Sequence, residues 1–206
     1  MEATAPHPLR ALSHPAFWTV VLGAIVALPL LHRVLGPPEL PLPVLGSVPA
    51  FQFQDQNGAP FGPQTLAGKP WVADFIFTRC PTVCPVMTER LAALAPQLGA
   101  RVHLVSLSVD PDFDTPERLK AFAKMHGATL ERWHFLTGDS ASVQRAVTDG
   151  FKISLEHEGA GDDFLSIVHG VHFVLVDGEG HIRGYYDSTD PEAMERLVHD
   201  ARRVGG

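Results

Sequence analysis

The sequence has little cysteine and no concentration of positive charge. Two cysteines in 206 residues are too few for a scaffold held together by disulfides. Acidic residues outnumber basic ones by 23 to 16, and there is no run of basic residues. This balance argues against nucleic acid, and against an anionic membrane surface, as a binding partner. The spacing of the two cysteines is therefore more informative than their number.

One long apolar run is present near the N-terminus. Residues 16–31 carry no charge, and with the apolar residues up to 35 the run reaches the length of a bilayer-spanning helix. No small-x-small cleavage site follows it, which favours an uncleaved anchor over a removed signal peptide. We therefore predict a cytoplasmic tail over 1–15 and a single-pass transmembrane anchor over 16–35. The predicted location is the cytoplasmic (inner) membrane, with the large C-terminal part on the periplasmic or other extracytoplasmic side.

A proline-rich spacer, residues 36–49, follows the predicted anchor. Such a composition is semi-extended and stiff, and it would hold a domain away from the membrane. The remaining residues, 50–206, have the size of one ordinary domain.

Strands and helices alternate along this domain. Buried or alternating apolar patterns predict strands, and amphipathic patterns with caps predict helices. The predicted strands cover 71–77, 102–109, 133–136, 171–176 and 181–186, and the predicted helices 86–98, 115–126, 140–148 and 190–203. An acidic, glycine-containing stretch, 156–163, is predicted to be a surface loop. This order indicates an α/β domain with a mixed central sheet flanked by helices.

Cys80 and Cys84 lie four residues apart, and each is followed by proline. A residue before proline is disfavoured in a helix, and proline itself suits the first helical turn. We therefore predict Cys80 in a loop and Cys84 at the N-terminus of a helix that begins at Pro85. The positive end of that helix would favour a thiolate. A strand that delivers two cysteines onto a helix N-terminus is a thioredoxin-like arrangement.

Two sulfurs in one short loop suit few chemical roles. They can cycle as a redox-active dithiol, or they can bind a soft metal such as Cu(I), zinc or an iron–sulfur centre. A purely structural disulfide is the alternative, but it would close too small a loop to stabilise the chain much. Two cysteines alone complete neither a structural zinc site nor a cluster, so a metal would need a third ligand.

Histidine is the expected source of that ligand. Of the 11 histidines, His169 and His172 lie just before or at the start of the predicted strand 171–176. In a thioredoxin-like fold the loop that enters this strand faces the cysteine loop. His169 is in that loop and is the favoured ligand. The side chain of His172 can instead pack on the sheet or face solvent. His157 is a weaker candidate for a metal ligand and reads mainly as a solvated loop residue.

Three segments together resemble one protein family. FIFTRCPTVCPVMT, SVDPDFDTPERLKAF and IVHGVHFVLVDGEGHIRGYY resemble, in this order, segments of the Sco/SenC family of copper-binding assembly proteins. The resemblance covers most of the chain beyond the spacer, and the combination is far more specific than two cysteines alone. The predicted anchor and spacer also fit this family.

The resemblance implies a function and a ligand set. It implies a copper ion held by Cys80, Cys84 and His169 and carried to the binuclear copper site of cytochrome c oxidase. The alternative that it leaves is a dithiol that reduces the cysteines of that site or of another extracytoplasmic partner. The implied partners are the copper-site subunit of the oxidase and a thiol reductant or copper donor protein. Two departures stand out. His172 is an additional histidine beside the expected one, and Gly170 replaces the small hydroxyl residue that is more usual there.

Several charged residues lie close to these motifs in the sequence. Asp110 and Asp114 follow a strand near the cysteine loop, where the resemblance implies an acidic residue that orients a ligand or a partner. Thr115 is the predicted N-cap of the helix that follows, and Asp114 reads mainly as part of that cap. Asp74 is an ionisable residue inside an apolar strand, where a carboxylate is costly unless it is paired or protonated. It is therefore expected to contact the site or a buried basic partner. Arg79 could favour the Cys80 thiolate or could simply be solvated.

Three functions compete at this stage. A membrane-tethered copper chaperone uses all three candidate ligands. A thiol–disulfide oxidoreductase uses Cys80 and Cys84 but has no role for His169, and its cysteines usually stand one residue closer. A peroxidase is only loosely suggested by Thr78 and Arg79. The first two are compatible, because the same dithiol must be reduced before it can take up copper.

Overall fold

The computed structural model describes residues 15–35, 40–153, 156–157, 167–168 and 171–205. It divides the chain into two units, one up to Pro41 and one over Leu42–Gly206. The first unit contains one described helix, α2 (Pro15–Leu35), with Pro29 inside it. None of the helices among the described residues combines the length and apolar character that crossing a bilayer would require. The predicted transmembrane anchor over 16–35 is therefore not confirmed, although α2 covers the same residues.

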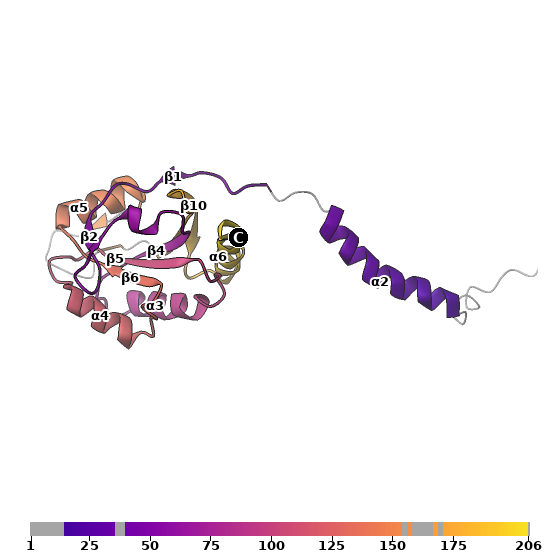
Figure 1. The fold of residues 1–206 in the computed structure, drawn as a ribbon. Helices are drawn as coiled ribbons and strands as arrows, with labels where there is room; N and C mark the ends of the chain where they lie inside the picture. Colours follow the sequence, from indigo (N-terminus) through magenta and orange to yellow (C-terminus); the bar gives the residue numbers. More distant parts are fainter. Residues whose placement is uncertain (1–14, 36–39, 154–155, 158–166, 169–170, 206) are drawn as a thin grey trace, which may run out of the picture. The chain divides into compact units, whose positions relative to one another are not determined.

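The second unit is built around a six-stranded mixed sheet (Figure 1). Strands β4, β5 and β6 are parallel, and β9, β10 and β1 continue the sheet in antiparallel pairs. In spatial order the strands are β1 (Gly46–Ser47), β10 (His181–Asp187), β9 (His172–Val176), β4 (Trp71–Ile76), β5 (His103–Ser108) and β6 (Trp133–Leu136). The predicted mixed sheet is thus observed, with β4 near its centre.

Helices cover both faces of the sheet. Every residue of β4 is buried, because its side chains alternate between the two layers. One layer contains α3 (Val83–Leu94), α4 (Pro116–Met125) and α6 (Pro191–Val204). The other contains α5 (Ser140–Arg145) and the π-helical turn Ala146–Gly150 that follows it. Figure 1 shows α3 and α4 on one side of the strands and α5 on the other.

Short elements complete the second unit. Phe53–Gln54 (β2) and Pro60–Phe61 (β3) form a small hairpin, followed by a 3-10 turn at Pro63–Leu66. Gln54 pairs with Thr137, so this segment lies along the outer edge of β6. A second hairpin joins β7 (Glu156–His157) to β8 (Ile167–Val168). The predicted loop over 156–163 is therefore wrong at its start, where Glu156 and His157 form a strand.

The spacer contributes to the folded unit instead of ending before it. Gly46 and Ser47 pair with Ile182 and His181 at the edge of the sheet. The carbonyl oxygen of Leu42 accepts a hydrogen bond from Arg183 (2.8 Å). Backbone pairing and this contact place the start of the unit at Leu42, earlier than the expected boundary at residue 50.

Candidate functional site

The two cysteines lie where β4 passes into α3. Helix α3 begins at Val83, so Cys84 is its second residue and the predicted start at Pro85 is wrong by two residues. Proline is tolerated there because N–H groups of the first turn have no partner within the helix. Cys80 precedes the helix, and its N–H donates to the carbonyl oxygen of Phe77 (3.1 Å).

Both cysteines are free thiols and both are buried. Their exposed fractions are 5% for Cys80 and 0% for Cys84. The N–H of Cys84 donates to the sulfur of Cys80 at 3.4 Å, so the loop folds back and brings Cys80 against the first turn of α3. The structure therefore brings these two predicted site residues together.

The proton on Cys84 is held more tightly than the sequence suggested. A hydrogen bond with Cys80 raises the pKa of the Cys84 thiol, and burial and the nearby charges of Cys80 and Asp74 raise it further. The predicted effect of the helix N-terminus, a lowered pKa at Cys84, is therefore outweighed. Burial disfavours the charged thiolate form of Cys84. The proton that Cys84 keeps can in turn be shared with the sulfur of Cys80, so the two thiols titrate as a pair.

Asp114 connects the cysteine loop to the segment that follows β5. Its side chain is fully buried and accepts hydrogen bonds from the N–H of Thr78 (3.0 Å) and from the hydroxyl of Ser108 (2.6 Å). The hydroxyl of Thr78 also donates to it. Thr115 caps α4 as predicted, but the interpretation of Asp114 as part of that cap is wrong. Asp114 instead fixes the residue two positions before Cys80.

Arg79 and Asp110 form an ion pair beside Cys80. The guanidinium of Arg79 contacts the carboxylate of Asp110 at 2.8 and 2.9 Å. Burial raises the pKa of Asp110, and the hydrogen bond and charge of Arg79 offset part of that rise. Arg79 is therefore paired with a carboxylate instead of being simply solvated, and its effect on the Cys80 thiolate stays a prediction.

Asp74 lies on the face of β4 that α3 and α6 cover. It is fully buried, and its Oδ1 accepts a hydrogen bond from the hydroxyl of Ser106 (2.6 Å). Ser106 in turn accepts one from the indole N–H of Trp133 (2.9 Å). Among the described residues, Oδ2 of Asp74 has no hydrogen-bond partner. Burial raises the pKa of Asp74 to about 7, and the Ser106 hydrogen bond lowers it only in part. No basic partner of Asp74 is found in the described part of the chain, contrary to one sequence-based expectation.

The candidate histidines have different outcomes. His169 lies outside the described residues. His172 is the first residue of β9, is half-buried, and stands opposite Asp187 of β10. His157 stands opposite Ile167 in the β7–β8 hairpin.

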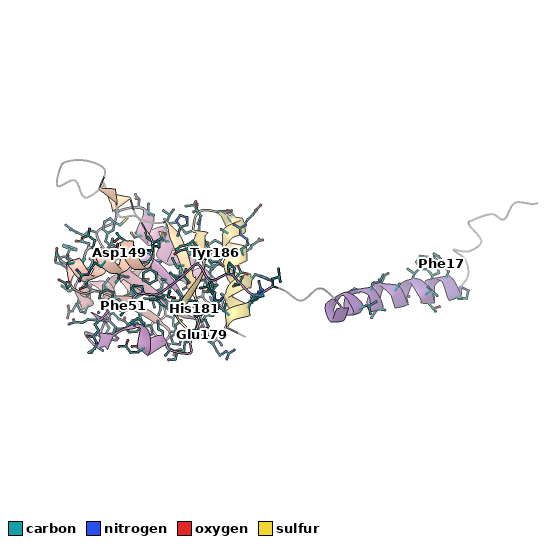
Figure 2. All side chains as sticks on the ribbon, turned by 90° about the horizontal axis from the view of Figure 1, so that it is seen from above. Phe17, Phe51, Asp149, Glu179, His181 and Tyr186 are labelled. Carbon is teal, nitrogen blue, oxygen red and sulfur yellow. The ribbon has the colours of Figure 1, made fainter. Side chains whose placement is uncertain are left out.

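A second group of metal-type side chains lies at the other end of the sheet. Asp177, Glu179 and His181 surround the turn between β9 and β10, and Figure 2 shows Glu179 and His181 close together. The carboxylate of Asp177 is paired with Arg183 (2.6 Å) and accepts two backbone N–H groups of the turn. These contacts explain the group as a structural part of the turn. None of its three members is a soft ligand of the kind that Cu(I) prefers.

Sequence reasoning missed the contacts that hold the cysteine loop in place. They involve one residue of the loop, Thr78, and three residues outside it, Ser108, Phe113 and Arg118. These residues contact Asp114 or Arg79 directly or through one another. The segment SVDPDFDTPE was noticed as a motif, but nothing local in it indicates which side chains point toward the cysteines.

Comparison with known proteins identifies the fold and the family. The family model described as SCO1/SenC matches residues 46–204. The SCO1 protein homolog of Bacillus subtilis is 34% identical, with 78% of this chain and 83% of that protein covered. A putative copper-binding protein of Stutzerimonas stutzeri is 33% identical, over 70% of this chain and 71% of that protein.

One solved structure matches with a TM-score of 0.71 and 29% identity, over 81% of this chain and 98% of the other. That protein, BsSco, is described as a member of the Sco family of cytochrome c oxidase assembly proteins with a disulfide switch. The mixed α/β, thioredoxin-like fold predicted from the sequence is thereby confirmed. The extent of the family match, together with the identity to these relatives, shows that the chain belongs to the SCO1/SenC family.

Proposed function

We propose that this protein is a copper-binding assembly factor that carries one copper ion to the binuclear copper site of cytochrome c oxidase. The observation that carries the proposal is the pair of free, buried thiols of Cys80 and Cys84, packed together at the start of α3. Thiolates select soft metals, Cu(I) in particular. The proposal is supported by two relatives, of which one is described as copper-binding and the other as a member of a family of cytochrome c oxidase assembly proteins.

His169 is proposed as the third ligand. Its own position is outside the described residues, but its neighbours in the chain are placed. Val168 ends β8, and Val171 packs against the hydrophobic cluster that contains both cysteines. Strand β9 then runs antiparallel to β4, the strand that leads into the cysteine loop. The contact of Val171 therefore supports a place for the chain just after His169 near the end of β4, where the thiols lie.

Delivery of the metal would proceed by exchange of ligands. A site of two sulfurs and one imidazole leaves copper with a low coordination number, so an incoming sulfur of the acceptor can bind before a resident sulfur leaves. Cys80 is slightly exposed whereas Cys84 is not. We therefore propose that Cys80 is replaced first and that Cys84 holds the ion until transfer is complete.

The first prediction concerns the ligands. In an anaerobic titration of the reduced full chain with Cu(I), we expect one tightly held copper per chain. Cys80→Ser and Cys84→Ser should each weaken binding more than about 100-fold, since even residues behind a ligand cost 10–100-fold when lost. His169→Ala should also weaken it and change the absorption of the Cu(II) form.

His172→Ala is the matched control for His169→Ala, because it removes an imidazole three positions along the chain. It should leave the affinity within about twofold, the range of an ordinary surface substitution. Greater damage from His172→Ala than from His169→Ala would refute the ligand assignment. Weak binding that does not depend on either histidine would refute the copper proposal itself.

The second prediction concerns pH. Because the pKa of Cys84 is raised above its ordinary value, this thiol keeps its proton through the neutral range and copper must displace it. Each displaced proton makes the affinity rise by about tenfold per pH unit. Competition with a Cu(I) chelator at pH 6, 7 and 8 should therefore show at least that slope, with tighter binding at higher pH. Affinity that is flat across this range would contradict the proton displacement.

A second function is favoured by the same pair of thiols and by the disulfide switch named for BsSco. In this role a thiolate of the pair attacks a disulfide of the partner, forms a mixed disulfide and expels one partner thiolate. The second thiolate then attacks the mixed disulfide and releases the other. Two electrons pass to the partner, which ends as a dithiol, while Cys80 and Cys84 end as a disulfide. A chain that reduces an oxidised copper-site peptide but binds copper only weakly would favour this role.

The location and partners of the chain belong to the proposal as well. We place the folded unit on the extracytoplasmic side of the inner membrane, held there by residues 16–35 as a single-pass anchor. The partners proposed on this basis are the copper-site subunit of the oxidase and a thiol reductant or copper donor protein. Exposed apolar side chains on α2, among them Val20, Ile25 and Val26, are consistent with an apolar environment for that helix.

A further inference from the structure

Two arginines stack on one aromatic ring beside the cysteine loop. The guanidinium carbon of Arg79 lies 4.2 Å from the centre of the Phe113 ring, and that of Arg118 lies 3.8 Å from it. Two guanidinium groups at these distances from one ring centre would overlap on the same face of the ring, so they lie on its opposite faces. Phe113 is therefore held between two cations, one from the residue before Cys80 and one from helix α4.

Helix α4 holds this ring from its own side. Arg118 donates from its guanidinium to the carbonyl oxygen of Phe113 (2.6 Å) while stacking on the ring. Its backbone N–H donates to the hydroxyl of Thr115 (3.4 Å), the N-cap of α4. The backbone and the ring of Phe113 are thus both tied to the first turn of a well-packed helix.

The segment that carries Phe113 is itself rigid. The N–H groups of Phe113 and Asp114 both donate to the carbonyl oxygen of Asp110, at 3.1 and 2.9 Å. The N–H of Asp110 donates to the hydroxyl of Ser108 (3.1 Å) at the end of β5. This segment consequently offers a fixed surface, made of the carboxylate of Asp110 and the ring of Phe113, to the side chain of Arg79.

We propose that Phe113 and Arg118 are positioning residues for the dithiol, which act on Cys80 through Arg79. The ring of Phe113, supported by Arg118, keeps Arg79 against Asp110 and so keeps the turn containing Cys80 closed over Cys84. This inference rests on the proposed role of Cys80 and Cys84 as the functional thiols, and it adds residues that touch neither sulfur.

The physical consequence is control over opening of the loop. Both thiols are buried, so a bulky reagent, an acceptor protein or a disulfide partner reaches Cys80 only after the turn opens. The rate of each such reaction is proportional to the population of the open form. Loss of the stack should raise that population, while Thr78 stays fixed by Asp114.

The test measures alkylation of Cys80 in the reduced, metal-free full chain, with the modified residue identified by mass spectrometry. Phe113→Leu removes the ring and Arg118→Gln removes one cation. Each should speed alkylation of Cys80 by roughly two- to fivefold, the range expected for one cation–π contact. Phe113→Tyr keeps the ring and should restore the wild-type rate. The double variant Phe113→Leu/Arg118→Gln should gain less than the product of the two single effects, because both act through one ring.

Lys124→Gln is the matched control for Arg118→Gln. It removes one positive charge from an exposed position of the same helix, in the last turn of α4. The alkylation rate should not change in this variant. Urea unfolding of every variant separates local opening from a general loss of stability, and the thiol–disulfide equilibrium with glutathione provides a second readout. The equilibrium constant should shift by the same two- to fivefold range in Phe113→Leu and return to the wild-type value in Phe113→Tyr.

The outcomes are distinct from those of the copper titration. Unchanged alkylation in both Phe113→Leu and Arg118→Gln would overturn the inference even if the wild type binds copper tightly. The inference would also be overturned if Phe113→Tyr were alkylated at Cys80 as fast as Phe113→Leu. A faster alkylation that is fully explained by a lower urea midpoint of the variants would overturn it as well. If the wild type binds no copper but the variants alkylate faster, the positioning role stands and the copper proposal falls. Arg118→Gln, which alters an exposed side chain, keeps the test valid if Phe113→Leu does not fold.

Discussion

Asp74→Asn is expected to stabilise the reduced protein by about 4 kcal/mol at pH 8 and by almost nothing at pH 4. The pKa of Asp74 is about 7 in the folded chain, against an ordinary value of 3.8. A shift of about 3 units corresponds to about 4 kcal/mol, as an order of magnitude. The cause is that an ionised carboxylate would be buried with one side-chain hydrogen bond, from Ser106, and with no cation beside it in the part of the chain that the structure describes. Asparagine has the same shape and no charge.

The direction of the pH dependence follows from which state releases its proton first. Between about pH 4 and pH 7 the unfolded chain has lost the Asp74 proton while the folded chain still holds it. Wild-type stability should therefore fall as pH rises through this window, and the decline contributed by Asp74 should stop above about pH 7. In Asp74→Asn this contribution is absent. Urea unfolding from pH 4 to pH 8 measures the difference between the two proteins.

An exposed carboxylate provides the control for this experiment. Asp149 lies on the surface of the π-helical turn after α5 and is labelled in Figure 2. Asp149→Asn should change stability by no more than about 0.5 kcal/mol at any pH in the range. A difference between Asp74→Asn and wild type that does not grow from pH 4 to pH 8 would show that Asp74 ionises normally. Asp74→Asn should also lower the pKa of Cys84, because the charge of Asp74 is one of the causes that raise that pKa.

Asp114→Ala is expected to destabilise the folded unit by about 3–5 kcal/mol and to open the cysteine loop. It leaves the N–H of Thr78 and the hydroxyls of Thr78 and Ser108 without their acceptor in a buried site. Each orphaned buried donor costs about 1–3 kcal/mol, with partial relief as the loop relaxes. Alkylation of Cys80 should accelerate much more than in Phe113→Leu, since the backbone of the loop itself loses its anchor.

Asp112→Ala is the matched control, two residues away in the same segment. Asp112 is exposed and accepts one hydrogen bond, from Ser140 (3.1 Å). Its loss should cost at most about 0.5 kcal/mol. Ser108→Ala, which removes one of the donors to Asp114, should give an intermediate effect of about 1 kcal/mol. If Asp114→Ala were as mild as Asp112→Ala, the carboxylate would not be what holds the turn before Cys80.

These two residues show where reasoning from the sequence reached its limit. The placement of Asp74 in an apolar strand was recognisably unusual, but a partner could not be named, because Ser106 is 32 residues away. Asp114 was read as a cap because capping is a local relation, visible in Asp114-Thr115-Pro116. One of its actual partners, Thr78, is 36 residues away, in the cysteine loop after β4. Hydrogen bonds across such separations depend on strand order and register, which no local pattern encodes.

The sequence by itself determined the alternation of strands and helices, the cap at Thr115, and the two cysteines at the junction of a strand and a helix. Each of these follows from periodicity, proline geometry or capping, which act over a few residues. The tertiary structure alone decided that Leu42 and β1 belong to the folded unit, that Asp114 and Arg79 hold the cysteine turn, and that Cys84 keeps its proton. The hydrogen bond with Cys80 and desolvation together outweighed the helix N-terminus in the last of these, because both depend on how the loop folds and on what packs around the sulfur.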